Sequence, residues 1–128
     1  RWPGRLELFG DQVYLDGAHN PHAMLRLIEF ANSLAGKRVK ILFGALKRKD
    51  YSGMLETLQT GLPESELILT TFHYGEVVAQ GDRQDLPYVA DYKAYIKEFM
   101  DQSRPDEVLF VTGSLYFIAE VRAFLLEG

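Results

Sequence analysis

The sequence predicts an α/β domain in which a mostly parallel sheet of about six strands lies between two layers of helices. Strand-like and helix-like segments alternate along the chain, and this order is typical of a parallel sheet with helices on both faces. The short apolar run at residues 39–46 is typical of a strand buried within such a sheet. The length of 128 residues suffices for one hydrophobic core, so we expect residues 1–128 to form a single domain.

The first two strands are predicted to form a hairpin. Residues 5–9 alternate between apolar and polar side chains, Gly10 and Asp11 are turn residues, and residues 12–15 follow as a second strand. A parallel pair needs a connection of about a dozen residues. The short connection therefore predicts that this pair is antiparallel.

The first helix is predicted to begin at Pro21, because Asn20 is a good N-cap and proline suits the first helical position. Gly36 fits the C-cap position. The helical face is marked by apolar residues in steps of three and four: Met24, Leu27, Ile28, Ala31 and Leu34. A strand at 39–46 and a helix at 51–58 come next, and Gly61 and Pro63 are expected to end that helix.

The second half of the chain continues the alternation. Residues 67–72 are predicted to form a strand, residues 73–87 a loop, and residues 89–100 a helix. A strand at 108–111 and a helix at 114–126 complete the domain. The expected apolar faces of the two helices are Tyr92, Tyr95, Ile96 and Phe99, and Leu115, Ile118, Val121 and Leu125.

Composition and charge exclude several classes of protein. The hydrophobic fraction of 47% and the charged fraction of 25% are those of a globular domain and not of a disordered chain. Because cysteine is absent, disulfides, thiolate metal sites and a cysteine nucleophile are excluded. No apolar run reaches the roughly 18 residues of a membrane span. The formal net charge of −4 argues against nucleic acid as a partner.

The chain begins on Arg1 without a methionine and shows no signal peptide. We therefore expect it to be a piece of a longer, cytoplasmic polypeptide. The usual phosphate-binding loops are missing from the sequence: Gly36-Lys37 lacks the earlier glycine of a P-loop, and there is no GxG pair. No GxSxG nucleophile elbow is present either.

Polar residues cluster at three predicted strand-to-helix turns: 16–21, 44–50 and 112–116. Each turn alone has a simple structural explanation, with Asn20, Asp50 and Ser114 as helix caps and Lys47-Arg48-Lys49 as a solvated loop. The carboxyl ends of strands in one parallel sheet, however, form a common rim where α/β sheets bind ligands. The convergence of three such turns favours a ligand-binding site there.

A metal site is not expected in this domain. His19 and His22 are three residues apart and could both contact a metal ion, but the sequence places no third ligand beside them.

Four sequence blocks resemble a known family. In chain order they are Trp2-Pro3-Gly4-Arg5-Leu6-Glu7, Leu15-Asp16-Gly17-Ala18-His19-Asn20-Pro21, residues 44–55 with Lys49-Asp50 and Gly53-Met54-Leu55, and Val111-Thr112-Gly113-Ser114-Leu115-Tyr116 followed by Glu120-Val121-Arg122. They resemble the C-terminal domain of folylpolyglutamate synthase and its bifunctional dihydrofolate synthase relatives, in the Mur ligase superfamily. One departure is that the family usually carries a further helix and strand between Phe72 and Val89, for which residues 73–87 offer no evident equivalent.

The resemblance implies a Rossmann-like three-layer sandwich that belongs to an ATP-dependent ligase. Such an enzyme adds L-glutamate to the γ-carboxylate of a reduced folate or its polyglutamate through an acyl phosphate. The phosphate loop and most Mg²⁺ ligands are implied to lie in an N-terminal P-loop domain of the same polypeptide. The C-terminal domain then closes over ATP and glutamate and is expected to be inactive alone.

The resemblance also implies roles for particular residues. Arg5 and His19 are implied to be catalytic and, with Asp16, to bind ATP, Asp16 through the ribose hydroxyls. The glutamate side of the cleft is implied to include Lys49, Asp50, Ser114 and Tyr116. Two alternatives stay open: a Mur-type ligase that joins an amino acid to a cell-wall precursor, and a non-catalytic small-ligand-binding module of the same fold.

Overall fold

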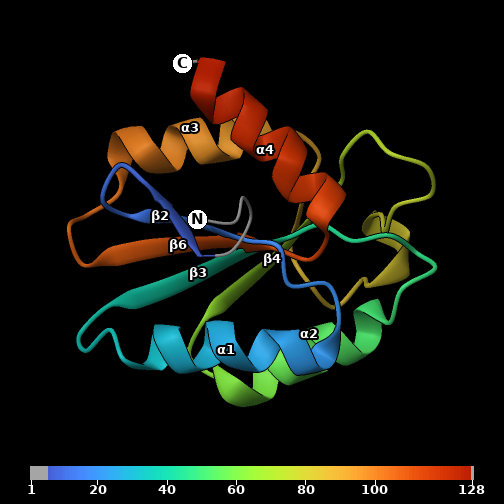
Figure 1. The fold of residues 1–128 in the computed structure, drawn as a ribbon, viewed down its shortest axis with the longest axis horizontal. Coiled ribbons are helices and arrows are strands. Elements are labelled where there is room, and N and C mark those ends of the chain that lie inside the picture. The colour runs from blue at the N-terminus through green and yellow to red at the C-terminus, as the bar shows by residue number, and fades with distance from the viewer. Residues whose placement is uncertain (1–5, 128) are drawn as a thin grey trace.

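The computed structural model describes residues 6–127. A single sheet has the strand order β1-β2-β6-β3-β4-β5. Helices α1 and α2 cover one face of this sheet, and α3 and α4 cover the other (Figure 1). The strands are β1 Glu7–Phe9, β2 Val13–Asp16, β3 Arg38–Phe43, β4 Glu66–Thr70, β5 Tyr88–Val89 and β6 Glu107–Thr112. The helices are α1 Pro21–Asn32, α2 Tyr51–Gly61, α3 Tyr92–Gln102 and α4 Leu115–Glu127.

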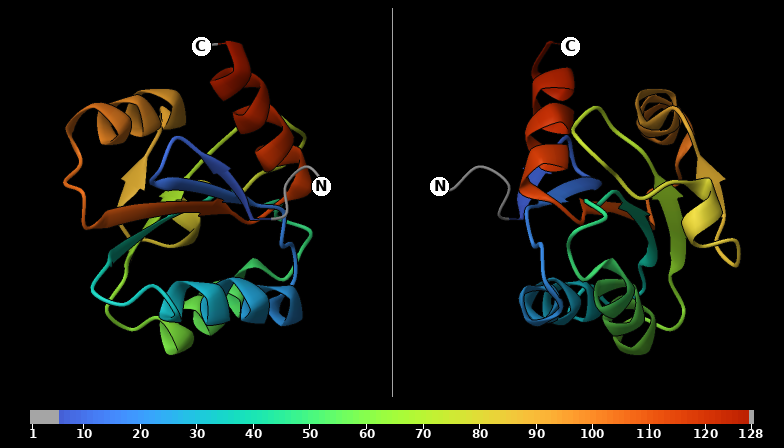
Figure 2. Two further views of the ribbon diagram at one scale, coloured as in Figure 1. Left: turned by 60° about the vertical axis from the view of Figure 1, so that its left-hand side comes forward. Right: turned by 90° about the vertical axis from the view of Figure 1, so that its right-hand side faces the viewer.

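The pairing of the strands confirms the predicted sheet. β1 and β2 form an antiparallel hairpin, and every other neighbouring pair is parallel. The two further views separate the layers and show α1 beside α2 on one side of the sheet (Figure 2). The fold is thus the expected three-layer α/β sandwich with six strands.

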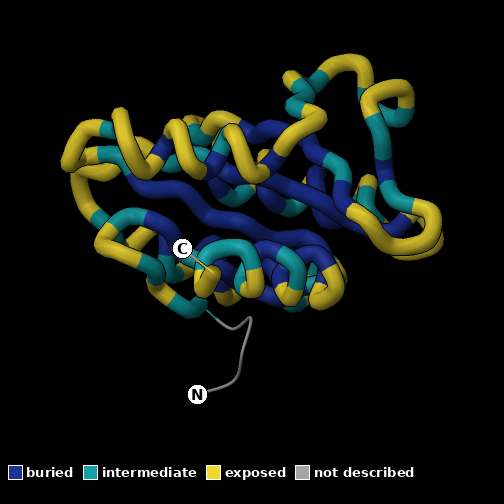
Figure 3. The backbone as a smooth tube through the Cα atoms, turned by 90° about the horizontal axis from the view of Figure 1, so that it is seen from above, coloured by how far each residue is buried: buried dark blue, intermediate teal, exposed yellow. Residues whose placement is uncertain are grey.

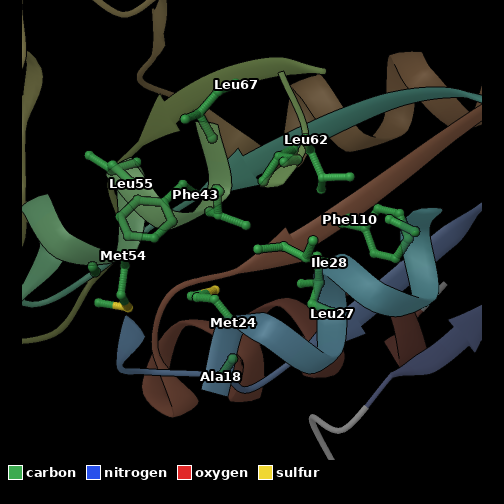
Figure 4. Packing of buried hydrophobic residues seen from close by; sticks show 14 of the residues in the cluster. Ala18, Met24, Leu27, Ile28, Phe43, Met54, Leu55, Leu62, Leu67 and Phe110 are labelled. Atoms are coloured by element: carbon green, nitrogen blue, oxygen red, sulfur yellow. The ribbon is translucent and has the colours of Figure 1, made fainter. Parts of the chain in front are cut away.

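Alternating side chains of the central strands build a core on each face. Ile41 and Phe43 pack toward α1 and α2, whereas Leu42 between them packs toward α3 and α4. Phe110 belongs to the first of these cores, together with Met24 and Ile28 (Figure 4). The central strands are mostly buried, except at the amino ends of β3 and β4, while the helices expose their outer sides (Figure 3). Burial on both faces explains the apolar sequences of these strands.

The predicted ends of the first helix and of the strand after it were wrong. Helix α1 ends at Asn32 and not near Gly36, because the Ser33 N–H and hydroxyl close its last turn on the carbonyl of Phe30. Gly36, at a φ of 77°, instead turns the chain into β3. The strand predicted to reach residue 46 leaves the sheet after Phe43, because residues 45–47 bond to the segment 76–78 instead.

The helix predicted to begin at Val89 begins at Tyr92. Asp91 is its N-cap and accepts a hydrogen bond from the Ala94 N–H at 3.1 Å. Tyr88 and Val89 instead form the short edge strand β5 beside β4. No strand was predicted at this position.

The remaining differences are smaller. Helix α2 continues through Gly61, and β4 covers Glu66–Thr70 in place of 67–72. The apolar face expected for the last helix was partly wrong, because Leu115 is 49% exposed and Phe117 is buried instead. Residues 73–87 form a loop as expected, apart from one 3₁₀ turn at Gln80–Asp82. None of the helices within residues 6–127 has the length and apolar character to cross a membrane.

Candidate functional site

The three polar turns meet at the carboxyl ends of β2, β6 and β3, which are neighbours in the sheet. A depression of about 280 Å³ lies between them. Its lining comes from all three turns: His19, Leu46, Arg48, Lys49, Ser114, Leu115 and Tyr116. The prediction that these turns share one rim is therefore confirmed.

A close backbone approach holds two of the turns together. The Gly44 N–H donates to the Thr112 carbonyl at 3.0 Å. Gly113 has a φ of 124° and lies so close to the Gly44 carbonyl that no β-carbon fits between them. Gly44 in turn lies on the ring of the buried Phe117. Both glycines are thus required for the contact between the β3 and β6 turns.

The first turn carries Asp16 and His19. Asp16 ends β2 and is fully buried, whereas His19 lies partly exposed at the depression. His19 Nδ1 is 3.1 Å from the Gly17 carbonyl oxygen. Because a carbonyl oxygen only accepts, Nδ1 carries a proton, and Nε2 is the nitrogen left for a ligand. Asn20 caps α1 as predicted, with its side-chain oxygen 2.8 Å from the Ala23 N–H.

The turn at residues 44–50, here called the basic turn, contains residues that support the structure and residues that line the depression. Lys47 forms an ion pair with Asp82 at 3.7 Å. Arg48 and Lys49 line the depression, while Asp50 does not and instead caps α2 by accepting from the Gly53 N–H at 2.9 Å. Two cations from this turn and His19 face the depression, and none of its lining residues is acidic.

The third turn contributes Ser114 and Tyr116. Ser114 is buried, and its hydroxyl oxygen accepts from the Tyr116 N–H at 3.1 Å at the start of α4. Ser114 therefore caps this helix while it also lines the depression. Arg5, the remaining predicted site residue, lies outside the residues that the structure describes.

Residues 73–78, which were predicted only as part of a loop, form part of this rim. Tyr74 stacks on Tyr116 with ring centroids 3.9 Å apart and an interplanar angle of 12°. The segment is held along the basic turn by the Lys47 N–H donating to Glu76 and the Val78 N–H donating to Ala45. The yellow-green segment and the teal turn lie together on the right of Figure 1. The one sequence signal that could have found it is Tyr74, an aromatic residue in a polar stretch.

Glu120 on α4 anchors the start of this segment. One carboxylate oxygen accepts from the His73 N–H at 3.1 Å, and the other lies 3.2 Å from His73 Nδ1 and accepts from the Tyr92 hydroxyl at 2.8 Å. Partial burial acts to raise the pKa of Glu120, but the hydrogen bonds from Tyr92 and His73 outweigh it and hold the pKa below its ordinary value. Burial and the Glu120 contact raise the pKa of Tyr92, so its hydroxyl stays a donor.

We expect Glu120→Gln to lower the free energy of unfolding by about 1 kcal/mol at neutral pH. A depressed carboxyl pKa contributes stability that is present above the unfolded value, near 4.5, and is lost as the pH falls through the folded pKa. The difference between wild type and variant should therefore shrink in acid. Urea unfolding of both proteins across a pH series measures it. A difference that is constant with pH would contradict this role of the Glu120 charge.

A larger depression, of about 710 Å³, lies at the opposite end of the sheet. It is bordered by Lys37, Arg38, Glu64 and Glu66, near the amino ends of β3 and β4. None of the predicted site residues that the structure describes lines it. Ligands of open α/β sheets bind beyond the carboxyl ends of the strands, so the smaller depression is the candidate site. Within residues 6–127 no group of three or more His, Asp or Glu side chains could hold a metal ion.

Comparison with known proteins gives the family. Residues 4–115 match the family model described as Mur ligase, glutamate ligase domain. This match covers most of the chain, including the first two turns of the rim and the third as far as Leu115. The chain belongs to the Mur ligase glutamate ligase domain family. The match thus includes most of the residues that carried the resemblance in the sequence, and Trp2, Pro3, Tyr116 and the segment Glu120-Val121-Arg122 lie outside it.

Two curated relatives of this chain have names that include folylpolyglutamate synthase. The dihydrofolate synthase/folylpolyglutamate synthase of Bacillus subtilis (strain 168) is 33% identical over 94% of this chain and 30% of that protein. The folylpolyglutamate synthase of Lacticaseibacillus casei is 30% identical over 99% of this chain and 30% of that protein. The chain therefore spans somewhat less than a third of the length of these curated relatives.

A solved structure shares the fold of the glutamate ligase domain. The bifunctional folylpolyglutamate synthase/dihydrofolate synthase from Yersinia pestis, complexed with AMPPNP and a Mn ion, superposes with a TM-score of 0.85 at 25% identity. The alignment covers 98% of this chain and 32% of that chain. That protein thus binds an ATP analogue and a divalent metal ion.

Proposed function

We propose that this chain is the C-terminal domain of an ATP-dependent folylpolyglutamate synthase. The observation that supports it best is the depression at the sheet rim, where His19, Arg48 and Lys49 come together without an acidic lining residue. All substrates of such a ligase are anionic, namely ATP, glutamate and the folate carboxylate. The sequence blocks that build the depression are also those that resemble folylpolyglutamate synthases. The two curated relatives have names that include this enzyme.

The proposed reaction has two steps. An oxygen of the folate γ-carboxylate attacks the terminal phosphorus of ATP, and the bond from that phosphorus to ADP breaks. The amine nitrogen of glutamate then attacks the acyl carbon and loses a proton, and phosphate leaves with the carboxylate oxygen. Charge builds up on phosphoryl oxygens in the first step and on the acyl oxygen in the second. Fixed cations at the rim stabilise such charge.

We assign the nucleotide side of the site to Arg5, Asp16 and His19. Arg5 neutralises phosphate charge, for which a planar guanidinium is well suited. His19 uses Nε2 to contact the nucleotide or the transferring phosphoryl group, since Nδ1 is held by Gly17. Asp16 contacts the ribose hydroxyls. Because Asp16 is fully buried in this structure, this contact requires its carboxylate to become accessible when the nucleotide binds.

We assign the glutamate side to Lys49, Ser114 and Tyr116, which line the depression together. Asp50 belongs to this side as the residue that fixes Lys49, because its carboxylate caps α2 directly after that lysine. We propose that the Mg²⁺ ligands and the phosphate loop lie in a P-loop domain of the same polypeptide. In the cytoplasm that domain and this one would close on ATP and a reduced folate.

The test is an assay of the full-length protein with a panel of substrates. Tetrahydrofolate with labelled L-glutamate and ATP is expected to give a glutamylated folate and ADP. Turnover with a cell-wall precursor and an amino acid, but not with folate, would keep the ligase reaction and replace the substrate. No ATP consumption with any substrate would contradict the proposal and favour a non-catalytic ligand-binding module.

In the full-length protein, Asp16→Ala is expected to raise the KM for ATP by about tenfold while kcat changes less, because the ribose is remote from the reacting phosphorus. Steady-state kinetics with ATP as the varied substrate measure both constants. Asp16→Asn, which keeps the shape of the side chain, controls for loss of folding, together with a thermal melt of each variant. A KM equal to that of wild type in folded variants would remove Asp16 from the nucleotide site.

A further inference from the structure

The Tyr74–Tyr116 pair is unusual for its exposure. The rings stack almost in parallel, yet the two residues are 42% and 46% exposed. Neither residue belongs to the buried clusters or packs against them in the described part of the chain. The stack therefore adds little to the core, and it presents flat aromatic surface to solvent at the rim of the candidate site.

Other contacts hold Tyr74 in this position. His73, directly before it, is bound by Glu120 through both its backbone N–H and its ring. After it, Val77 forms an antiparallel bridge with Leu46. Both ends of the short segment are thus fixed, one to α4 and the other to the basic turn. A ring placed on such a supported segment loses little further conformational freedom when it binds a ligand.

Arg48 and the depression lie beside the pair. Tyr116 and Arg48 line the same depression, together with His19 and Lys49. Hydrogen bonding with Tyr116 raises the pKa of Tyr74, and the charge of Arg48 acts in the opposite direction. Both tyrosines are therefore near Arg48. A stacking surface next to a cationic depression matches a ligand that has a flat ring at one end and negative charge at the other.

We propose that the Tyr74–Tyr116 pair and Arg48 bind a flat aromatic ring that carries a carboxylate or phosphate tail. The ring stacks on the outer face of the pair, and the tail enters the depression. Two molecules share this chemistry: the aminobenzoyl-glutamate end of a folate and a nucleoside monophosphate. The choice of these two rests on the proposed function, whereas the site itself rests on the contacts above.

Titration of this chain, followed by NMR, tests the proposal. The probes are p-aminobenzoyl-glutamate, AMP, and two anions without a ring, L-glutamate and inorganic phosphate. We expect one aromatic probe to bind at least about fivefold more tightly than the anion that matches its tail, and to shift the ring signals of both tyrosines. The tighter aromatic probe identifies the source of the ligand. Equal binding of ring-bearing and ring-free anions would overturn the proposal.

Four variants locate the site. Tyr74→Ala is expected to weaken binding of the aromatic probe about fivefold, while Tyr74→Phe keeps the ring and the affinity. Arg48→Ala is expected to weaken all anionic probes, whereas Arg26→Ala, which removes an exposed arginine from α1, leaves them unchanged. Wild-type affinity in Tyr74→Ala or in Arg48→Ala would contradict the assignment. If Tyr74→Ala does not fold, the comparison of Arg48→Ala with Arg26→Ala decides.

The ligation assay separates this proposal from the proposed function. Binding of an aromatic probe that depends on Tyr74, without ligation by the full-length protein, would support the site and contradict the folate ligase. Ligation with unchanged KM values for folate and ATP in Tyr74→Ala would support the ligase and contradict the stacking site.

Discussion

Gly113→Ala is expected to lower the free energy of unfolding by about 2–4 kcal/mol. The φ of 124° at Gly113 is a conformation that side chains disfavour, and the added carbon would collide with the backbone carbonyl of Gly44. Backbone cannot yield as a flexible side chain does, so the β3 and β6 turns must separate. Urea unfolding of the wild-type and variant chains measures the loss.

Gly36→Ala is the matched control for this experiment. Gly36 also has a positive φ, of 77°, but apart from its chain neighbours no described residue has an atom within 4 Å of the position that its β-carbon would take. Its substitution should therefore cost only the conformational term, about 1 kcal/mol. Equal losses in the two variants would show that the contact between Gly113 and Gly44 does not hold the turns together.

In the full-length protein, Arg5→Ala and His19→Ala are each expected to lower kcat by about 10²-fold. The physical reason is that a fixed cation or hydrogen-bonding group stabilises the charge on the transferring phosphoryl oxygens more than it stabilises bound ATP. Single-turnover measurement of ADP formation isolates this step from product release. His19→Ala removes the ring whose Nδ1 is already bound to Gly17 and whose Nε2 remains for the ligand.

The control for these variants is His22→Ala. His22 is exposed on α1 and lines a different surface groove, so its loss should leave kcat near the wild-type value. A wild-type kcat in both Arg5→Ala and His19→Ala would contradict their catalytic assignment. A fall of equal size in His22→Ala would show that the effect is not specific to the site.

Local signals made part of the fold predictable from sequence. Asn20 and Asp50 carry short side chains that satisfy free N–H groups within three residues, so the helices they cap begin where the sequence predicts. The apolar strands and the short hairpin connection likewise indicated the class of sheet, because both are local features of the sequence. The prediction that Gly36 ends α1 was wrong, because glycine permits a positive φ in any turn. Here that turn follows the helix by several residues.

Long-range contacts account for what the sequence did not predict. The strand β5 is defined by pairing with β4 across a loop, and its two residues carry no periodic pattern of their own. Tyr74 reaches the site through Glu120 and Tyr116, which lie far along the chain. By contrast, the shared rim of the three turns was predictable, because neighbouring parallel strands end on the same side of a sheet.

The most direct test of the proposed ligase uses the full-length protein with ATP, L-glutamate and a folate whose γ-carboxylate is labelled with a heavy oxygen isotope. The two-step reaction transfers one carboxylate oxygen to the departing phosphate. We therefore predict a glutamylated folate, ADP, and inorganic phosphate that carries one heavy oxygen, as measured by mass spectrometry. Unlabelled phosphate, or ATP consumption without a glutamylated folate, would contradict the account.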